Sequence, residues 1–146
     1  MRGADLDIQD FVRERVHSCY WDREINCATT SLLLLGEKFG VELSDQVLDA
    51  AAGMHGAGGY RAQCGLVEGP LMFLGIVGRQ AGIPEREIEK ACQEFAAGFE
   101  HRFSSLLCSV LRPGGFNRDD PPHLCEDLSC RAISYSIEFV HGFING

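Results

Sequence analysis

Hydrophobic residues recur at helical spacing along most of the chain, and the alternating β-branched runs typical of strands are missing. The pattern predicts helices over residues 6–20, 26–39, from 44 onward, 66–81, 84–111, and from 123 or 129 to 143. Gly40 is expected to end the second helix. Residues 53–59 contain four glycines, too many for a helix to continue.

Length and composition complete the expected fold. The chain has 146 residues, of which 45% are hydrophobic, as in ordinary globular domains. We therefore expect an all-α fold, a compact single-domain helical bundle of about five to six helices that spans residues 1–146.

The expected helix over 84–111, which Pro113-Gly114-Gly115 would end, carries the clearest apolar stripe. Its members are Ile88, Cys92, Phe95, Phe99, Phe103, Leu106 and Val110. Cys92 lies on this stripe, so we interpret it as a core thiol. Cys108 projects roughly opposite the stripe and is expected either to be exposed or to meet a second set of partners.

The last expected helix is apolar on two sides. One stripe consists of Cys130, Ile133, Ile137, Val140 and Ile144, and the other of Ala132, Tyr135, Phe139 and Phe143. Such a helix is buried by neighbouring helices or by another subunit. A homodimer through the last helix is therefore one expectation.

Charge limits the range of partners. The chain carries 13 basic and 21 acidic residues, a formal net charge of −8, which disfavours binding to phosphate backbones. No apolar run approaches the length of a membrane span, and the chain does not begin with an apolar signal region. We expect no nucleic-acid partner, no membrane insertion and a cytoplasmic location.

Seven cysteines dominate the candidate chemistry. Their number is odd, which argues against a framework of structural disulfides. No two of them form a C-x-x-C pair, so the sequence lacks the local signature of thioredoxin-like and zinc-ribbon proteins. Any site that joins several cysteines must be assembled by the fold.

Two cysteines stand at expected helix starts. Cys27 follows Asn26, a good N-cap residue, and Cys64 follows the glycine-rich break. Free backbone N–H groups at a helix start stabilise a thiolate and lower its pKa. Cys64 is therefore the candidate reactive thiol, unless both cysteines simply suit tight helix starts as small residues. His55, within the break, is expected to be exposed to solvent.

An ordered set of motifs resembles a known family. The set consists of Asn26-Cys27-Ala28, then Cys64-Gly65-Leu66-Val67-Glu68-Gly69, then Cys108, then Cys130. It resembles the C_GCAxxG_C_C family of redox-active proteins from about Cys19 to the end of the chain, with Leu66 where the family has alanine. The resemblance implies a cytoplasmic, all-helical protein whose redox or metal site is formed by Cys27, Cys64, Cys108 and Cys130. Cys125 is the alternative for the last position.

Three functional hypotheses follow. Four thiolates suit an iron–sulfur cluster or zinc, and the resemblance favours iron–sulfur, in an oxidoreductase, an electron carrier or a redox sensor. Metal-free thiol–disulfide chemistry is the first alternative, with Cys64 as the attacking thiol and Cys27 or Cys108 as its resolving partner. A helical binding or scaffold module with packing cysteines is the second. The sequence does not name a redox partner.

Overall fold

The computed structural model describes residues 2–112 and 121–146, and its regular structure there is helical, which confirms the all-α prediction. The long helices are α1 (Arg2–His17), α2 (Cys27–Phe39), α5 (Gly65–Gln80), α6 (Glu85–Phe103) and α8 (Glu126–Asn145). The short elements are the π-helical η1 (Ser18–Asp22), α3 (Asp45–Ala50), α4 (Gly56–Gly59), α7 (Cys108–Leu111) and the 3-10 turn η2 (Pro122–Cys125). None of the helices in these ranges is long and apolar enough to cross a membrane.

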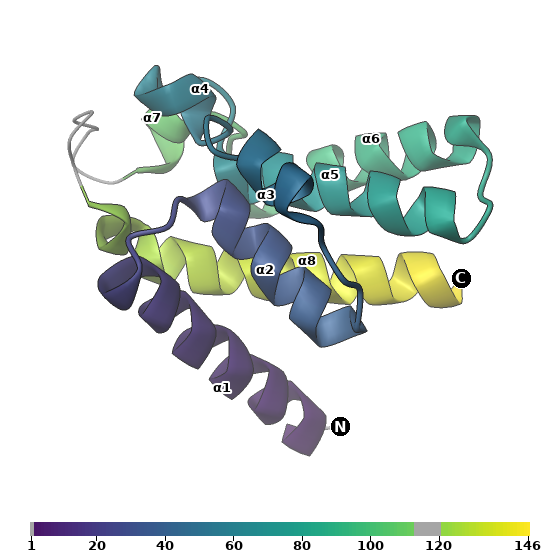
Figure 1. The fold of residues 1–146 in the computed structure, drawn as a ribbon, viewed down its shortest axis with the longest axis horizontal. Coiled ribbons are helices and arrows are strands. Elements are labelled where there is room, and N and C mark those ends of the chain that lie inside the picture. Colours follow the sequence, from purple (N-terminus) through teal and green to yellow (C-terminus); the bar gives the residue numbers. More distant parts are fainter. Residues whose placement is uncertain (1, 113–120) are drawn as a thin grey trace.

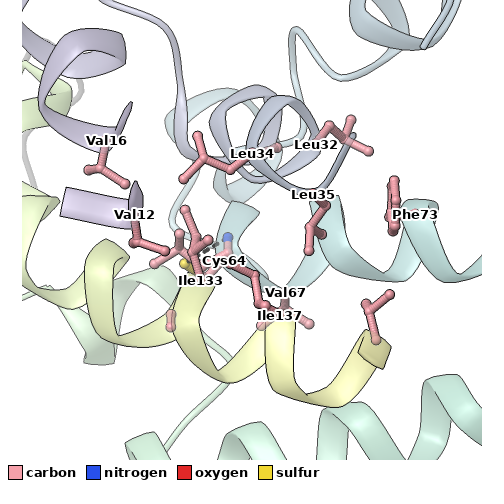
Figure 2. Close-up of a cluster of buried hydrophobic side chains, with 14 of the residues drawn as sticks. Val12, Val16, Leu32, Leu34, Leu35, Cys64, Val67, Phe73, Ile133 and Ile137 are labelled. Atoms are coloured by element: carbon pink, nitrogen blue, oxygen red, sulfur yellow. Dashed lines mark hydrogen bonds between the residues drawn. The ribbon is translucent and has the colours of Figure 1, made fainter. Parts of the chain in front are cut away.

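Helix α8 runs through the middle of the bundle and packs against α1, α2, α5 and α6 (Figure 1). Helix α2 lies along α5, which is the most extensive pairing of the fold. Figure 2 shows buried side chains from α1, α2, α5 and α8 meeting in one cluster, among them Val12, Leu35, Val67 and Ile133. The helices therefore share one apolar core.

Both apolar faces of α8 are largely covered within one chain, although Ile144 at the end of the helix is 47% exposed. Ile133 and Ile137 are buried in the shared core. On the other face, the rings of Tyr135 and Phe139 lie 5.2 and 5.3 Å from the ring of Phe95 in α6, centroid to centroid. Neighbouring helices thus account for the two-sided pattern, and the homodimer stays a prediction.

The prediction of a single helix over residues 84–111 is wrong. Helix α6 ends at Phe103 because Ser104 adopts a left-handed conformation, with φ of 80°, and its backbone N–H donates to the Glu100 carbonyl. The chain then continues as the separate helix α7, where Val110 is 60% exposed and no longer part of the core. The expected stop at Pro113-Gly114-Gly115 lies outside the described residues.

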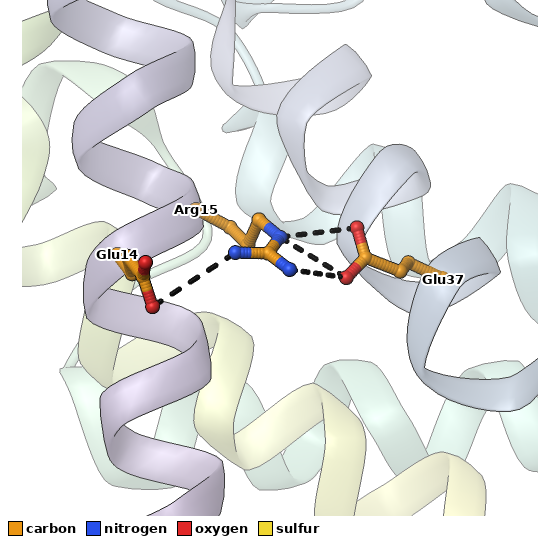
Figure 3. Close-up of polar contacts among 3 residues, drawn as sticks. All are labelled: Glu14, Arg15 and Glu37. Carbon is orange, nitrogen blue, oxygen red and sulfur yellow. Dashed lines mark hydrogen bonds and ion pairs between the residues drawn. The ribbon is translucent and has the colours of Figure 1, made fainter.

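A surface ion pair links the first two long helices. The Arg15 guanidinium in α1 contacts both carboxylate oxygens of Glu37 in α2, with Nη2 2.9 Å from Oε2, and lies 3.9 Å from Glu14 (Figure 3). Because both partners are largely exposed, the Arg15–Glu37 pair contributes no more than about 1 kcal/mol. It therefore adds little to the stability of the fold.

Candidate redox site

The starts of α2 and α5 carry two of the predicted site cysteines. Asn26 is the N-cap of α2, and its side-chain oxygen accepts a hydrogen bond of 2.9 Å from the Thr29 backbone N–H. Cys64 is the N-cap of α5, and its sulfur accepts from the Leu66 N–H at 3.4 Å. The predicted helix starts at both cysteines are confirmed.

Two glycines allow these helix starts to touch. A Cβ atom added to Gly65 would lie 2.5 Å from the Cys27 sulfur, and one added to Gly69 would lie 2.6 Å from the Ala28 carbonyl oxygen. Residues spaced four apart share one helix face, so both glycines of the motif face α2. Any larger side chain at either position would separate the helices and withdraw Cys27 from α5.

The Cys27 and Cys64 thiols interact closely enough for each to shift the pKa of the other. The Cys27 sulfur also interacts with the backbone N–H groups of Gly65, Ala28 and Cys27 itself, so amides from both helix starts converge on it. The Cys64 sulfur accepts from the Leu66 N–H. With more donors around it, Cys27 is the better place for the negative charge.

This arrangement separates the acidities of the two thiols. The interaction with Cys64, assisted by the backbone amides and opposed by burial, lowers the pKa of Cys27. The same interaction, together with burial, raises the pKa of Cys64 well above its usual range. The amides around the Cys27 sulfur come from two helices, so the sequence could not show them, and which of the two thiols is the reactive one stays a prediction.

Cys108 reaches the same place through backbone pairing. The Cys64 N–H donates to the Leu106 carbonyl at 2.8 Å, and the Cys108 N–H donates to the Ala62 carbonyl at 2.9 Å. Gly56, in the glycine-rich break, has φ of +67°, and an added Cβ would lie 3.2 Å from the Cys108 Cβ. The break therefore gives clearance to Cys108. Burial raises the pKa of the Cys108 thiol.

A cavity of about 310 Å³ joins four of the cysteines. Its lining residues are Tyr20, Glu24, Asn26, Cys27, His55, Cys64, Leu66, Cys108, Arg112, Pro122 and Cys125. The predicted residues Cys27, Cys64 and Cys108 are thus brought together, and Cys125 lines the cavity with them. Burial, together with repulsion from the Cys27 and Cys125 thiolates, raises the pKa of Tyr20 well above its usual range.

Cys130, the preferred fourth cysteine, lies elsewhere. It is half-buried in α8 and lines a different cavity, beside Arg13 and Arg131. Burial raises the pKa of the Cys130 thiol to about 11. The structure groups Cys125 with the other three cysteines instead. The apolar stripe that contains Cys130 gives its face of the last helix but not the cavity that this face lines.

Sequence reasoning missed two polar residues of the cavity. His55 was expected to be exposed, but it is half-buried, and its Nδ1 atom is buried without a hydrogen-bond partner among the described residues. Arg112 is only 8% exposed, and its guanidinium donates to the Pro121 carbonyl at 3.3 Å. The one sequence signal for His55 was its place in the glycine-rich break, and no sequence signal pointed to Arg112.

The remaining two cysteines lie outside the cavity. Cys19 is buried in the core and Cys92 packs against it, as predicted for Cys92. Burial raises the pKa of both thiols. Neither has the surroundings of a reactive thiolate.

The positions of the donor side chains do not suit the metal that the resemblance implies. Within residues 2–112 and 121–146, no group of three or more cysteine, histidine, aspartate or glutamate side chains is arranged to hold a metal ion. The Cys27–Cys64 pair supplies two sulfurs, whereas a zinc ion or an iron–sulfur cluster held by one chain takes three or four protein ligands. As arranged, the residues do not fit either group.

Comparison with known proteins assigns the chain to a family. The model of the family described as "Putative redox-active protein (C_GCAxxG_C_C)" matches residues 25–139. The chain belongs to this family, which confirms the resemblance seen in the sequence. No curated protein and no solved structure matches the chain.

Proposed function

We propose that this protein is a dithiol redox protein in which Cys27 and Cys64 exchange two electrons with a substrate disulfide. The observation that carries the proposal is the position of the Cys27 sulfur, which lies against Gly65 at the start of α5 and lines one cavity with Cys64. A sulfur in such surroundings is ionised more readily than a free thiol, and the thiolate is the attacking species in disulfide exchange.

The exchange proceeds in two balanced steps. The Cys27 thiolate attacks one sulfur of the substrate, which forms a mixed disulfide and releases the other half of the substrate as a thiolate. Cys64 then loses its proton to that thiolate and attacks the Cys27 sulfur. The Cys27–Cys64 disulfide forms, and the second half leaves as a thiolate that takes up a proton from water. Two protein thiols are oxidised, and one substrate disulfide is reduced to two thiols.

The pH dependence of alkylation tests this assignment. The rate of iodoacetamide modification of Cys27 should rise with an apparent pKa below the ordinary value of about 8.5. Cys64→Ser keeps a hydrogen-bond donor, so it should keep this low pKa while abolishing disulfide formation. Cys64→Ala removes the donor and should raise the pKa of Cys27.

Cys92→Ser, outside the cavity, is the matched control and should leave the alkylation profile unchanged. Modification of Cys27 only at the pH of an ordinary thiol would overturn the proposal. Modification of Cys64 ahead of Cys27 would assign the attacking role to the other sulfur.

An iron–sulfur cluster is the second candidate, favoured by the four thiols that line one cavity. It would need the Cys108 and Cys125 sulfurs to move toward the Cys27–Cys64 pair. Anaerobically purified protein should then contain iron and acid-labile sulfide, and both should be lost in Cys125→Ser but kept in Cys130→Ser. Zinc without sulfide would indicate a zinc site at the same cysteines.

A further inference from the structure

His55 brings an unpaired polar atom to the cysteine cavity. It lines this cavity, and its Nδ1 atom is buried without a hydrogen-bond partner among the described residues. Buried polar atoms are nearly always paired in folded proteins, so an unpaired one calls for an explanation. Because an imidazole readily takes up and releases a proton near neutral pH, proton transfer is one such explanation.

Backbone pairing places His55 beside the start of α5. The Gly56 N–H donates to the Gln63 carbonyl at 3.1 Å, and the Ala62 N–H donates to the Gly56 carbonyl at 3.2 Å. Gly56 directly follows His55, and Gln63 directly precedes Cys64. The chain at His55 therefore runs next to the chain at Cys64, and both residues line the same cavity.

The Cys64 thiol must lose its proton before its sulfur can attack Cys27. Cys64 is only 4% exposed, so bulk water has little access to that proton. The interaction with Cys27 and burial both raise the pKa of the Cys64 thiol well above its usual range. The burial remains after Cys27 has joined the mixed disulfide, so Cys64 still needs a neighbouring base to take its proton.

The other titratable or charged groups that line the cavity are poorer proton acceptors. Burial, together with repulsion from nearby thiolates, raises the pKa of Tyr20 well above its usual range, so its hydroxyl already holds its proton. Glu24 is exposed, and a carboxylate is a far weaker base than an imidazole. The guanidinium of Arg112 has no acceptor atom. Cys108 and Cys125 carry thiols, which are themselves mostly protonated at neutral pH. The imidazole is therefore the lining group best suited to take a thiol proton.

We infer that His55 accepts the proton of Cys64 when Cys64 attacks the mixed disulfide at Cys27. This inference rests on the proposed function and adds a residue to the same reaction. The proton passes from the Cys64 sulfur to the imidazole, the Cys64 sulfur bonds to the Cys27 sulfur, and the bond from Cys27 to the substrate sulfur breaks. The imidazolium then gives its proton to a released substrate thiolate, which returns His55 to its neutral form. The contact between His55 and Cys64 has to form only during the reaction, since such hydrogen bonds often tighten after the substrate has bound.

Rapid mixing of the reduced protein with hydroxyethyl disulfide separates the two steps. The rate of attack by Cys27 depends on the disulfide concentration, whereas the rate of resolution by Cys64 does not. Mass spectrometry of acid-quenched samples follows the mixed disulfide as it forms and decays. His55→Gln should slow the resolution about a hundredfold while leaving the rate of attack within about twofold. His101→Gln, exposed on α6, is the matched control and should leave both rates unchanged.

Two further readouts separate proton transfer from a structural role of His55. In the wild-type protein the rate of resolution should level off as the pH rises through the titration of one base. In His55→Gln it should instead climb about tenfold per pH unit, because only ionisation of Cys64 itself then supplies the thiolate. In His55→Ala, added imidazole should restore part of the lost rate in proportion to its concentration. If His55→Gln does not fold, His55→Asn is closer to the imidazole in shape and should show the same slow resolution.

The outcomes separate this inference from the proposed function. An unchanged rate of resolution in a folded His55 variant would refute the inference and leave the dithiol function in place. A slower rate that keeps the wild-type pH profile and does not respond to imidazole would do the same, because it would assign His55 a structural role. Failure of the wild-type protein to form the Cys27–Cys64 disulfide would overturn the proposed function itself.

Discussion

Gly65→Ala tests whether close contact between α2 and α5 keeps Cys27 ionised. The added methyl carbon would lie 2.5 Å from the Cys27 sulfur and 2.8 Å from the Ala28 backbone nitrogen. Ordinary contacts between heavy atoms are about 3.5–4.0 Å, so the two helices must separate locally by about 1 Å. That movement would draw the Gly65 N–H away from the Cys27 sulfur.

The expected magnitude follows from two opposing effects. Alanine is a better helix former than glycine by about 1 kcal/mol, which favours the substitution. Overpacking against backbone and a buried sulfur costs about 1–3 kcal/mol and prevails here because α2 cannot move without disturbing the core that it shares with α5. A net loss of about 1–2 kcal/mol lowers the melting temperature by roughly 2–8 °C in a chain of this size.

Two assays follow the variant: urea unfolding for the free energy of unfolding, and alkylation against pH for the pKa of Cys27. Gly75→Ala is the matched control, since it lies in the same helix and a Cβ there meets nothing within 4 Å. It should stabilise the protein by up to about 1 kcal/mol and leave the pKa of Cys27 unchanged. If Gly65→Ala behaves like Gly75→Ala in both assays, close helix contact does not determine the acidity of Cys27.

Three further substitutions test the surroundings of the site. Asn26→Ala removes the N-cap of α2 and should cost about 0.5–2 kcal/mol in urea unfolding, with a higher pKa for Cys27. Ser129→Ala leaves the buried Tyr20 hydroxyl without its 2.6 Å partner and should cost about 1–3 kcal/mol by the same measurement. Burial acts to raise the pKa of Glu126, but the hydrogen bond from Trp21 helps to lower it below its ordinary value. Glu126→Gln should therefore make the stability fall less steeply below about pH 4.5.

Each of these substitutions has its own check. Ser44→Ala should cost less than Asn26→Ala, because Ser44 begins α3 without a side-chain hydrogen bond. The Tyr20→Phe/Ser129→Ala double variant should recover part of the loss in Ser129→Ala, since both partners are then apolar. For Glu126, a lowered pKa gives stability that is present above the unfolded pKa and lost as the pH falls through the folded pKa. An unchanged acid profile in the variant would contradict this assignment.

Local signals predicted much of the fold. Gly40 does end α2, in a left-handed conformation, and Asn26 caps its start through its own side chain. The end of α6 was missed because the apolar spacing continues past Phe103, while the break depends on the left-handed conformation of Ser104, a residue that does not demand it. Periodicity identifies the face of a helix more reliably than its end.

The sequence indicated that Cys27 and Cys64 lie at helix starts, and the structure brings both to one cavity. Their relative acidity depends on amides contributed by both helices, which no local pattern encodes. The choice between Cys125 and Cys130 depends on how η2 and α8 lie against the cavity, a property of tertiary packing.

The most direct test of the central claim is to map the disulfide that forms when the reduced protein equilibrates with hydroxyethyl disulfide. Peptide mass mapping should find a bond between Cys27 and Cys64, with Cys19, Cys92 and Cys130 still present as thiols. The bond should revert to two thiols on addition of dithiothreitol. A protein whose Cys27 and Cys64 both remain thiols while other cysteines oxidise would contradict the account.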